Sequence, residues 1–468
     1  MSPSKKLSKK IEENLEAIRS AVYETEDLKT RDLIFLDKPC KLLFIDSLVD
    51  KKQIERNIIE PLLECKQETG PESVIKNAEY SRTTDLEVTV NGLLEGSCAL
   101  LSEGVHSVLL MPVGAVDSKS ISEPENEHII KGSHDGFLEN IDKNLFLIRR
   151  RVKNPSLRIK NYTLGSKTNT KASIVYIEEL VDHGPLDVLM KRIEAVNVGE
   201  LQSAGELEEL IEDNSYSVFP QILSTERPDR AASYLLEGKS LVIVDGTPHV
   251  LVSPITFFSF YQSPDDYNSR WIIGSFFRLI RIFSFLVAIC LPAIYIAVVS
   301  FHSEVLPIGI QYAIRVQIEY VPLPPFFEAI AMQLVLELLK EAAIRLPSPI
   351  AQTIGIVGGL VIGTAIVEAG FVSNTMIVVV ALTAIASFVA PVNQMGTGAR
   401  IMAFPIMLAA TFFGFLGIVL ALSVLLIHLC RLESFGKPYL EPLAPLHFKG
   451  MKDSLIKFKK RNNTLKQT

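Results

Sequence analysis

The sequence has almost no charge in three long stretches. Residues 282–301, 346–399 and 401–427 contain one charged side chain between them, Glu368, although 21% of the 468 residues are charged. These 101 residues are too apolar and too numerous for the core of one soluble domain. Because the rest of the chain is rich in charge, a simple soluble enzyme, a disordered chain and a wholly membrane-embedded protein are excluded. The sequence predicts a soluble N-terminal half joined to a membrane half.

Cysteine pairs and catalytic motifs are also missing. The five cysteines form no CxxC pair and the eight histidines show no ligand spacing, so neither a disulfide framework nor a metal site is predicted. The sequence contains no Walker loop, GxSxG, HExxH or kinase motif. We predict a protein that is not an enzyme and needs no cofactor. An enzyme in the soluble half is the alternative that converging polar groups in a pocket would support.

The long N-terminal part lacks the excess positive charge that nucleic-acid binding requires. The net charge of the chain is −6, and segment 431–468 alone carries +6, so the rest carries −12. A basic tail after a membrane segment is typical of the cytosolic side. The charged N-terminus contains no apolar run of signal-peptide length. We therefore expect both termini in the cytosol and no nucleic-acid partner.

Two small soluble subdomains, 1–137 and 138–270, are predicted, of the α/β or α+β class. In the first, residues 51–67 have helical spacing broken at Pro61, and residues 85–102 begin with the alternation of a strand. The second contains strand-like and helix-like runs separated by turns, at 157–165, 172–181, 185–198 and 240–254, the last reading as a hairpin. The run Arg149-Arg150-Arg151 fits either a domain interface or a lipid-headgroup patch.

An all-α membrane domain is predicted over 271–430, followed by the basic cytosolic tail 431–468. At about 1.5 Å per residue, four apolar segments can cross a hydrocarbon core of roughly 30 Å: 282–301, 350–369, 374–391 and 403–428. Segment 325–346 is amphipathic and carries five ionisable residues: Glu328, Glu337, Lys340, Glu341 and Arg345. We expect this segment on the outer face of the membrane or re-entering it, with its charges neutralising one another. Four spans return the tail to the cytosol.

Segment 350–369 presents two opposed stripes. Gly355, Gly359 and Gly363 follow the spacing that lets helix backbones approach closely. The roughly opposite side is apolar in the middle and polar at both ends, and it consists of Thr353, Val357, Val361, Thr364 and Glu368. These five are candidates to line a pore, with Val361 as the constriction and Glu368 as a cation-attracting ring. The alternative is a tight helix pair inside one subunit, with Glu368 at the water interface.

Several long runs resemble a known family in their order along the chain. They include SAGELEELIEDNSYSVFPQILSTERPDRAASYLLEGKSLVIVDGTPHVLV (203–252), SPDDYNSRW (263–271), VPLPPFFEAIAMQLVLELLKEAAIRLPSPIAQTIGIVGGLVIG (321–363), VVVALTAIASFVAP (378–391) and SFGKPYLEPLAP (434–445). These runs, with NLFLIRRRVKNPSLRI (144–159) upstream, resemble the spore germination receptor A subunits, the GerA family. The resemblance covers about residues 138–445, and residues 1–137 match loosely.

The resemblance implies a function and partners. Family members are A subunits of nutrient-responsive receptors in the inner spore membrane, and they assemble with a transporter-like B subunit and a lipoprotein C subunit. They are thought to form oligomers, as pentamers, that act as ligand-gated cation channels. The resemblance therefore favours the pore interpretation of segment 350–369. The competing hypothesis is a non-conducting membrane scaffold that couples the nutrient sensor to cytosolic germination machinery.

Overall fold

The chain divides into two compact units. The computed structural model describes residues 6–65, 70–76, 79–114, 123–127, 129, 131–347, 350, 359, 361 and 363–446. Unit 1 comprises Met1–Asp213, Ile222–Ile255 and Ser434–Lys437. Unit 2 comprises Asn214–Gln221, Thr256–Glu433 and Pro438–Thr468. Each unit therefore includes a short segment that lies far from its main body in the sequence.

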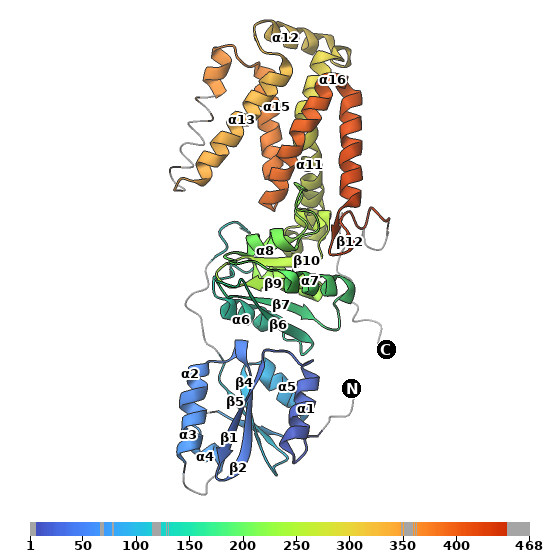
Figure 1. The fold of residues 1–468 in the computed structure, drawn as a ribbon. Helices are drawn as coiled ribbons and strands as arrows, with labels where there is room; N and C mark the ends of the chain where they lie inside the picture. Colours follow the sequence, from blue (N-terminus) through green and yellow to red (C-terminus); the bar gives the residue numbers. More distant parts are fainter. Residues whose placement is uncertain are drawn as a thin grey trace. The chain divides into compact units, whose positions relative to one another are not determined.

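The first half of unit 1 is a five-stranded antiparallel sheet covered by helices on both faces (Figure 1). Its strands follow the order β1-β2-β4-β5-β3 and comprise β1 (Leu28–Phe35), β2 (Lys38–Ile45), β3 (Ser81–Thr83), β4 (Ser97–Ser102) and β5 (Val108–Pro112). On one face lie α1 (Ile11–Ala21) and α5 (Leu86–Leu94). On the other lie α2 (Lys51–Ile54), the π-helical turn Glu55–Ile59 and α3 (Glu60–Glu64), followed by the short α4 (Pro71–Val74). Burial on both faces explains why the central strands are apolar throughout.

The second half of unit 1 has the same plan. Its antiparallel strand order is β6-β7-β9-β10-β8, with β6 (Leu157–Leu164), β7 (Thr170–Ile177), β8 (Leu223–Thr225), β9 (Ser240–Val244) and β10 (Val250–Ser253). The core on one face includes side chains of α7 (His183–Ala195) and α8 (Ala204–Ile211), whereas α6 (Ile141–Arg151) packs against α9 (Pro228–Leu236). The hairpin predicted over 240–254 is confirmed by the antiparallel pairing of β9 with β10.

The two halves are copies of one motif. Both run helix, two strands, helical segment, strand, helix and two strands, and their sheets have equivalent strand orders. The sequence Leu-Leu-Glu-Gly at 93–96 recurs at 235–238. Gly96 and Gly238 end the preceding helices at φ +86° and +82°, a conformation that disfavours side chains. At this spacing of 142 residues, β3, α5 and β5 align with β8, α9 and β10. The repeat was not predicted from the sequence.

Two local predictions in the first copy are wrong. Residues 86–94 form α5 rather than a strand, because Asp85 caps the helix by accepting a hydrogen bond from the Glu87 N–H at 2.8 Å. Pro61 does not break the helical segment. It occupies the second position of α3, directly after the π-helical turn, where its missing N–H is tolerated.

Arg149 joins the two copies within unit 1. Its guanidinium is 2% exposed, and its Nε lies 3.2 Å from Oδ2 of Asp27. Its Nη2 donates to Oγ1 of Thr25 at 3.2 Å. Because Asp27 and Thr25 precede β1 whereas Arg149 belongs to α6, the domain-interface interpretation of the arginine run is confirmed for this residue. Such a buried charge is tolerated when it is paired and hydrogen-bonded.

Unit 2 is helical. Its helices are α10 (Pro264–Asn268), α11 (Trp271–Ser300), α12 (Ile308–Glu319), α13 (Pro325–Ile344), α15 (Asn374–Phe388) and α16 (Asn393–Arg431). The short strands β11 (Glu433–Ser434) and β12 (Lys437–Pro438) follow, and each has one residue in unit 2 and one in unit 1. Among the described residues, α11 and α16 are long and apolar enough to cross a membrane, and α15 is apolar but shorter. Most of the predicted span 350–369 lies outside the described residues.

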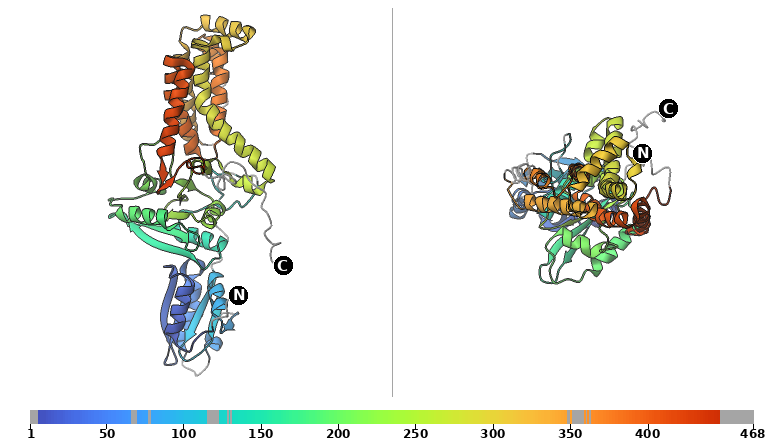
Figure 2. Two further views of the ribbon diagram at one scale, coloured as in Figure 1. Left: turned by 90° about the vertical axis from the view of Figure 1, so that its right-hand side faces the viewer. Right: turned by 90° about the horizontal axis from the view of Figure 1, so that it is seen from above.

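The predicted span 403–428 is not one continuous helix. α16 bends at Gly414, which has φ 56° and ψ −134°, and its two arms run back alongside each other (Figures 1 and 2). Gly414 lies against the side chains of Phe301 and His302, beyond the end of α11. Positions 398 and 428, in opposite arms, both contact the loop at 217–219. A glycine is required at the bend because this backbone conformation is essentially closed to other residues.

Segment 325–346 forms α13, which contacts other helices near both of its ends. Near its start, α13 contacts Ser373 at the beginning of α15. Near its end, it contacts Arg400 and Asn393 at the beginning of α16. The outer or re-entrant course of this segment in the membrane stays a prediction, and within unit 2 α13 extends along the other helices. The reason is that its ionisable residues find polar partners on other helices.

Candidate functional site

The candidate pore stripe is described in part. Thr353, Gly355 and Val357 lie outside the described residues. Val361 is 55% exposed, and Thr364 and Glu368 are also exposed. A Cβ built on Gly359 or Gly363 would meet nothing within 4 Å among the described residues. At these two glycines, the described part of the chain shows no close intramolecular helix partner.

The helical residues 363–368 end at a glycine cap. Gly370 adopts φ +70°, its N–H donates to the Val367 carbonyl at 2.9 Å, and the Phe371 N–H donates to the Ile366 carbonyl at 3.1 Å. This pair of bonds is the Schellman pattern, in which a left-handed residue satisfies the last helical carbonyls. The cap fixes the end of the helix within one turn of Glu368.

Glu328 is buried at the start of α13. It is 1% exposed, and its Oε1 accepts hydrogen bonds from the Ser373 N–H at 2.5 Å and from the Ser373 hydroxyl at 2.6 Å. The Tyr295 hydroxyl lies 3.2 Å from the same serine Oγ. This polar group joins α13, α15 and α11 at one end of the bundle. Because the carboxylate lies at the N-terminus of α15, the helix dipole also favours its charge.

The other end of α13 carries the remaining charges. Glu337 forms an ion pair with Arg400 of α16, and Arg400 is 5% exposed. The Lys340 ammonium donates to Oδ1 of Asn393 at 3.4 Å. Self-neutralisation within the helix, as predicted, is seen for Glu341 and Arg345, which pair at 2.6 Å. Glu337 is instead neutralised by another helix.

Sequence reasoning missed the loop Asn214–Gln221. The loop connects α8 to β8, two elements of unit 1, but it belongs to unit 2. Phe219 is fully buried, with its ring centroid 6.3 Å from that of Phe285 and 6.4 Å from that of His428. The one available signal was an apolar Val-Phe-Pro turn inside an otherwise polar connection.

The segment Ser434–Lys437 is the converse case of a segment that belongs to the other unit. It follows α16 but belongs to unit 1. Phe435 is 1% exposed and forms part of the core built by β7, β9, α7 and α8. Its N–H donates to Oδ2 of Asp213 at 2.7 Å, and the Arg192 guanidinium lies 5.0 Å from its ring centroid. The Lys437 ammonium lies 2.5 Å from Oδ2 of Asp182.

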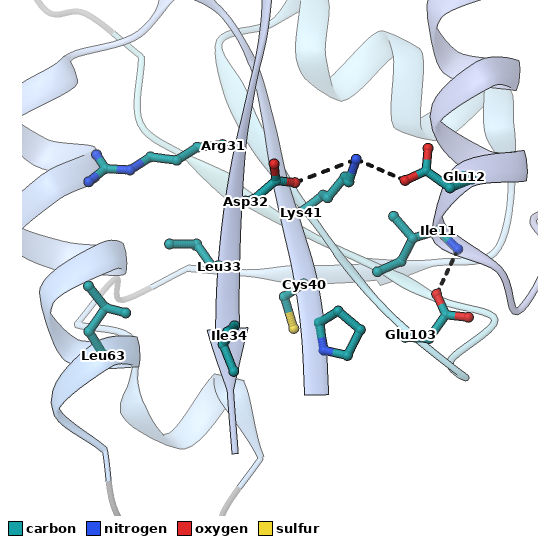
Figure 3. Close-up of a pocket in the computed structure, with 11 residues that line it drawn as sticks. Ile11, Glu12, Arg31, Asp32, Leu33, Ile34, Cys40, Lys41, Leu63 and Glu103 are labelled. Carbon is teal, nitrogen blue, oxygen red and sulfur yellow. Dashed lines mark hydrogen bonds and ion pairs between the residues drawn. The ribbon is translucent and has the colours of Figure 1, made fainter. Parts of the chain in front are cut away.

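A hollow of about 640 Å³ lies beside the β1–β2 hairpin in the first copy (Figure 3). The Lys41 ammonium lies 2.9 Å from a carboxylate oxygen of Glu12 and 3.5 Å from one of Asp32. Glu103 accepts a hydrogen bond from the Ile11 N–H at 3.0 Å. These polar groups are therefore occupied by one another. Among the described residues, no group of three or more His, Cys, Asp or Glu side chains could hold a metal ion.

Comparisons with known proteins agree along the chain. The profile of the family described as Bacillus/Clostridium GerA spore germination protein matches residues 16–467. Spore germination protein GerLA of Bacillus cereus is 36% identical, over 96% of this chain and 93% of that protein. Spore germination protein B1 of Bacillus subtilis is 38% identical, over 96% and 94%. Spore germination protein A1 of the same species is 36% identical, over 97% and 94%.

A solved structure also aligns with part of the chain. The N-terminal domain of the A subunit of the Bacillus megaterium spore germinant receptor GerK3 aligns with 54% of this chain and 98% of its own, at a TM-score of 0.42 and 24% identity.

Proposed function

The chain belongs to the Bacillus/Clostridium GerA spore germination protein family, and on that premise we propose that it is the A subunit of a nutrient-responsive germinant receptor. In this proposal, copies of the chain, as a pentamer, form a cation channel in the inner spore membrane. A transporter-like B subunit binds the nutrient and a lipoprotein C subunit completes the receptor. Opening releases cations and starts germination.

The exposed face of residues 359–368 carries the channel proposal. Within the part of the chain that the structure describes, nothing lies within 4 Å of a Cβ built on Gly359 or Gly363, and Val361 and Glu368 are exposed. A carboxylate facing lipid is costly, so such residues normally face a bundle interior or water. A second copy packed on the glycines, with a water-filled axis next to Glu368, would satisfy both stripes.

The arrangement of unit 2 supports a six-crossing topology. α13 and α15 both run from the end where α11 finishes to the end where α16 begins. Because α13 and α15 run in the same direction, the proposal assigns the return crossing to segment 350–369, and the arms of α16 add two further crossings. The four predicted spans thus become six in this proposal. The even number leaves both termini in the cytosol.

A substitution at Val361 tests the channel. Val361→Ala widens the proposed constriction, so spores carrying it should release K⁺ several-fold faster without nutrient. Val378→Ala is the matched control, because Val378 lies on α15 and is similarly exposed, at 58%. Release is measured with a K⁺ electrode, and the amount of receptor by immunoblot.

Unchanged K⁺ release from Val361→Ala spores with normal receptor amounts would remove Val361 as the gate. The scaffold alternative is tested separately by imaging the purified receptor. A ring with segment 350–369 around its axis supports the channel, whereas a monomer or dimer without an axial opening supports the scaffold.

A further inference from the structure

Loop 214–221 is fixed to three helical segments of unit 2. Phe219 packs against Phe285 of α11 and His428 in the second arm of α16. The Val218 carbonyl lies against Gly398 in the first arm, where a Cβ would lie 2.8 Å from the carbonyl oxygen. Such a distance is shorter than real side chains allow, so the glycine permits the approach. The loop thus contacts α11 and both arms of α16.

Hydrogen bonds hold the loop in one shape. At its base, the Asn214 N–H donates to Oε1 of Gln221 and Nε2 of Gln221 donates to the Asn214 carbonyl, both at 2.8 Å. At its tip, Oγ of Ser217 lies 3.1 Å from Nε2 of His428. The Tyr439 hydroxyl donates to the Pro220 carbonyl at 2.8 Å. A loop closed at its base and bonded at its tip can move as a body with the helices it touches.

A second segment makes the opposite exchange, because residues 434–437 follow a helix of unit 2 and belong to unit 1. Residues 434–437 leave the end of α16 and place Phe435 in the core of the second copy. Asp213, the residue directly before the loop, accepts the Phe435 N–H. The chain therefore passes from one unit to the other at 213–214 and 221–222, at the two ends of the loop, and at 433–434 and 437–438, at the two ends of segment 434–437. Asp213 of the second copy is thus joined to the loop by the chain and to Phe435 by a hydrogen bond.

We propose that loop 214–221 is a positioning element that sets the separation of α11 and the two arms of α16. Together with residues 434–437, the loop transmits a conformational change of unit 1 to the helices, and so sets the nutrient threshold for opening. This inference rests on the proposed channel function. Its residues act through the helices and touch neither ions nor nutrient.

Gly398→Ala tests the proposal, because its Cβ must displace the Val218 carbonyl. The matched control is Gly309→Ala in α12, where a Cβ meets none of the described residues within 4 Å. Both variants are placed at the native locus, and K⁺ release from spores is measured without nutrient and against graded mixtures of the twenty amino acids with glucose. We expect Gly398→Ala to raise unstimulated release or to shift the half-maximal mixture concentration at least threefold, and Gly309→Ala to change neither.

Variants that disturb the loop less than Gly398→Ala are used if spores carrying Gly398→Ala contain too little receptor. Tyr439→Phe removes the hydroxyl bonded to the loop, and Ser217→Ala combined with His428→Ala removes the tip contact. The nutrient threshold of the double variant is compared with the sum of the shifts that Ser217→Ala and His428→Ala cause separately. A difference between the two indicates that the loop and the helix act as one coupled element. Normal amounts with wild-type thresholds in all variants would overturn the proposal. Absence of any receptor-dependent K⁺ release from wild-type spores would instead overturn the channel function.

Discussion

At the scale of single residues, burial decides which polar groups matter. Arg149 and Glu328 are almost completely buried, and each is matched by specific partners on another element. The sequence singled out both positions, as part of an arginine run and as a charge in an apolar segment. The sequence did not identify their partners, because Asp27 and Ser373 lie far away along the chain and belong to no recognisable motif.

Glu212 carries a pH-dependent prediction. Partial burial, followed by the charges of Glu209 and Asp213, raises the pKa of Glu212 from 4.5 to about 7. The folded state binds the Glu212 proton more tightly than the unfolded state does. The stability that this protonated carboxyl contributes is therefore complete below pH 4.5 and is lost as the pH rises to about 7. Glu212→Gln should stabilise the protein at pH 7.5 by about 1 kcal/mol after allowance for solvent screening, and leave it unchanged at pH 4.5. Thermal unfolding of the detergent-purified chain across this range measures the effect, and a parallel wild-type and variant pH profile would refute it.

At the scale of elements, backbone geometry limited the prediction most. The strands and helices of the second copy follow from hydrophobic periodicity, and β6, β7, α7, β9 and β10 were predicted close to their observed places. The bend in α16 was missed, because an apolar stretch predicts a span whether it runs straight or doubles back. The one signal was Gly414 and Gly417 among aromatic residues.

The Gly414 bend can be tested by adding a methyl group. Gly414→Ala places a Cβ 3.1 Å from Nε2 of His302 and 3.2 Å from the Phe301 ring, in a backbone conformation that disfavours side chains. We expect a cost of about 3 kcal/mol from strain and crowding, and less receptor in the membrane. Immunoblotting of membrane fractions measures this. The Gly309→Ala variant serves again as the control, and equal amounts of the two variants would contradict a required bend.

At the scale of the whole molecule, the repeat and the exchanged segments organise the chain. Composition distinguished a charge-rich N-terminal half from an apolar C-terminal half, but the predicted boundary at 270 does not coincide with the two units. Residues from Thr256 to Glu433 lie in unit 2, and residues 434–437 lie in unit 1. The exchange of segments 214–221 and 434–437 between the units was not predicted, because a hydrophobic pattern shows that a residue is buried and does not show which element it packs against. The repeat was visible as Leu-Leu-Glu-Gly and needed a search at long spacing.

The exchanged Phe435 carries the last prediction. Removing its buried ring by Phe435→Ala should destabilise unit 1 by about 3 kcal/mol. Phe435 has φ 52°, so Phe435→Gly relieves the backbone while still removing the ring. If the ring matters, both variants unfold at lower temperature than wild type, with glycine the milder. Wild-type stability of the glycine variant would show that the ring contributes little.

The exchange also governs how the protein can be divided for study. A soluble fragment ending at 255 would leave an unfilled site where Phe435 lies and would expose the apolar tip Val218-Phe219 to solvent. A fragment beginning at 256 would lack Phe219, which packs between Phe285 and His428 in the whole chain. Adding a short peptide that spans 432–439 to the fragment ending at 255 would refill the first gap, so complementation in trans becomes a way to measure how tightly segment 434–437 binds the rest of unit 1.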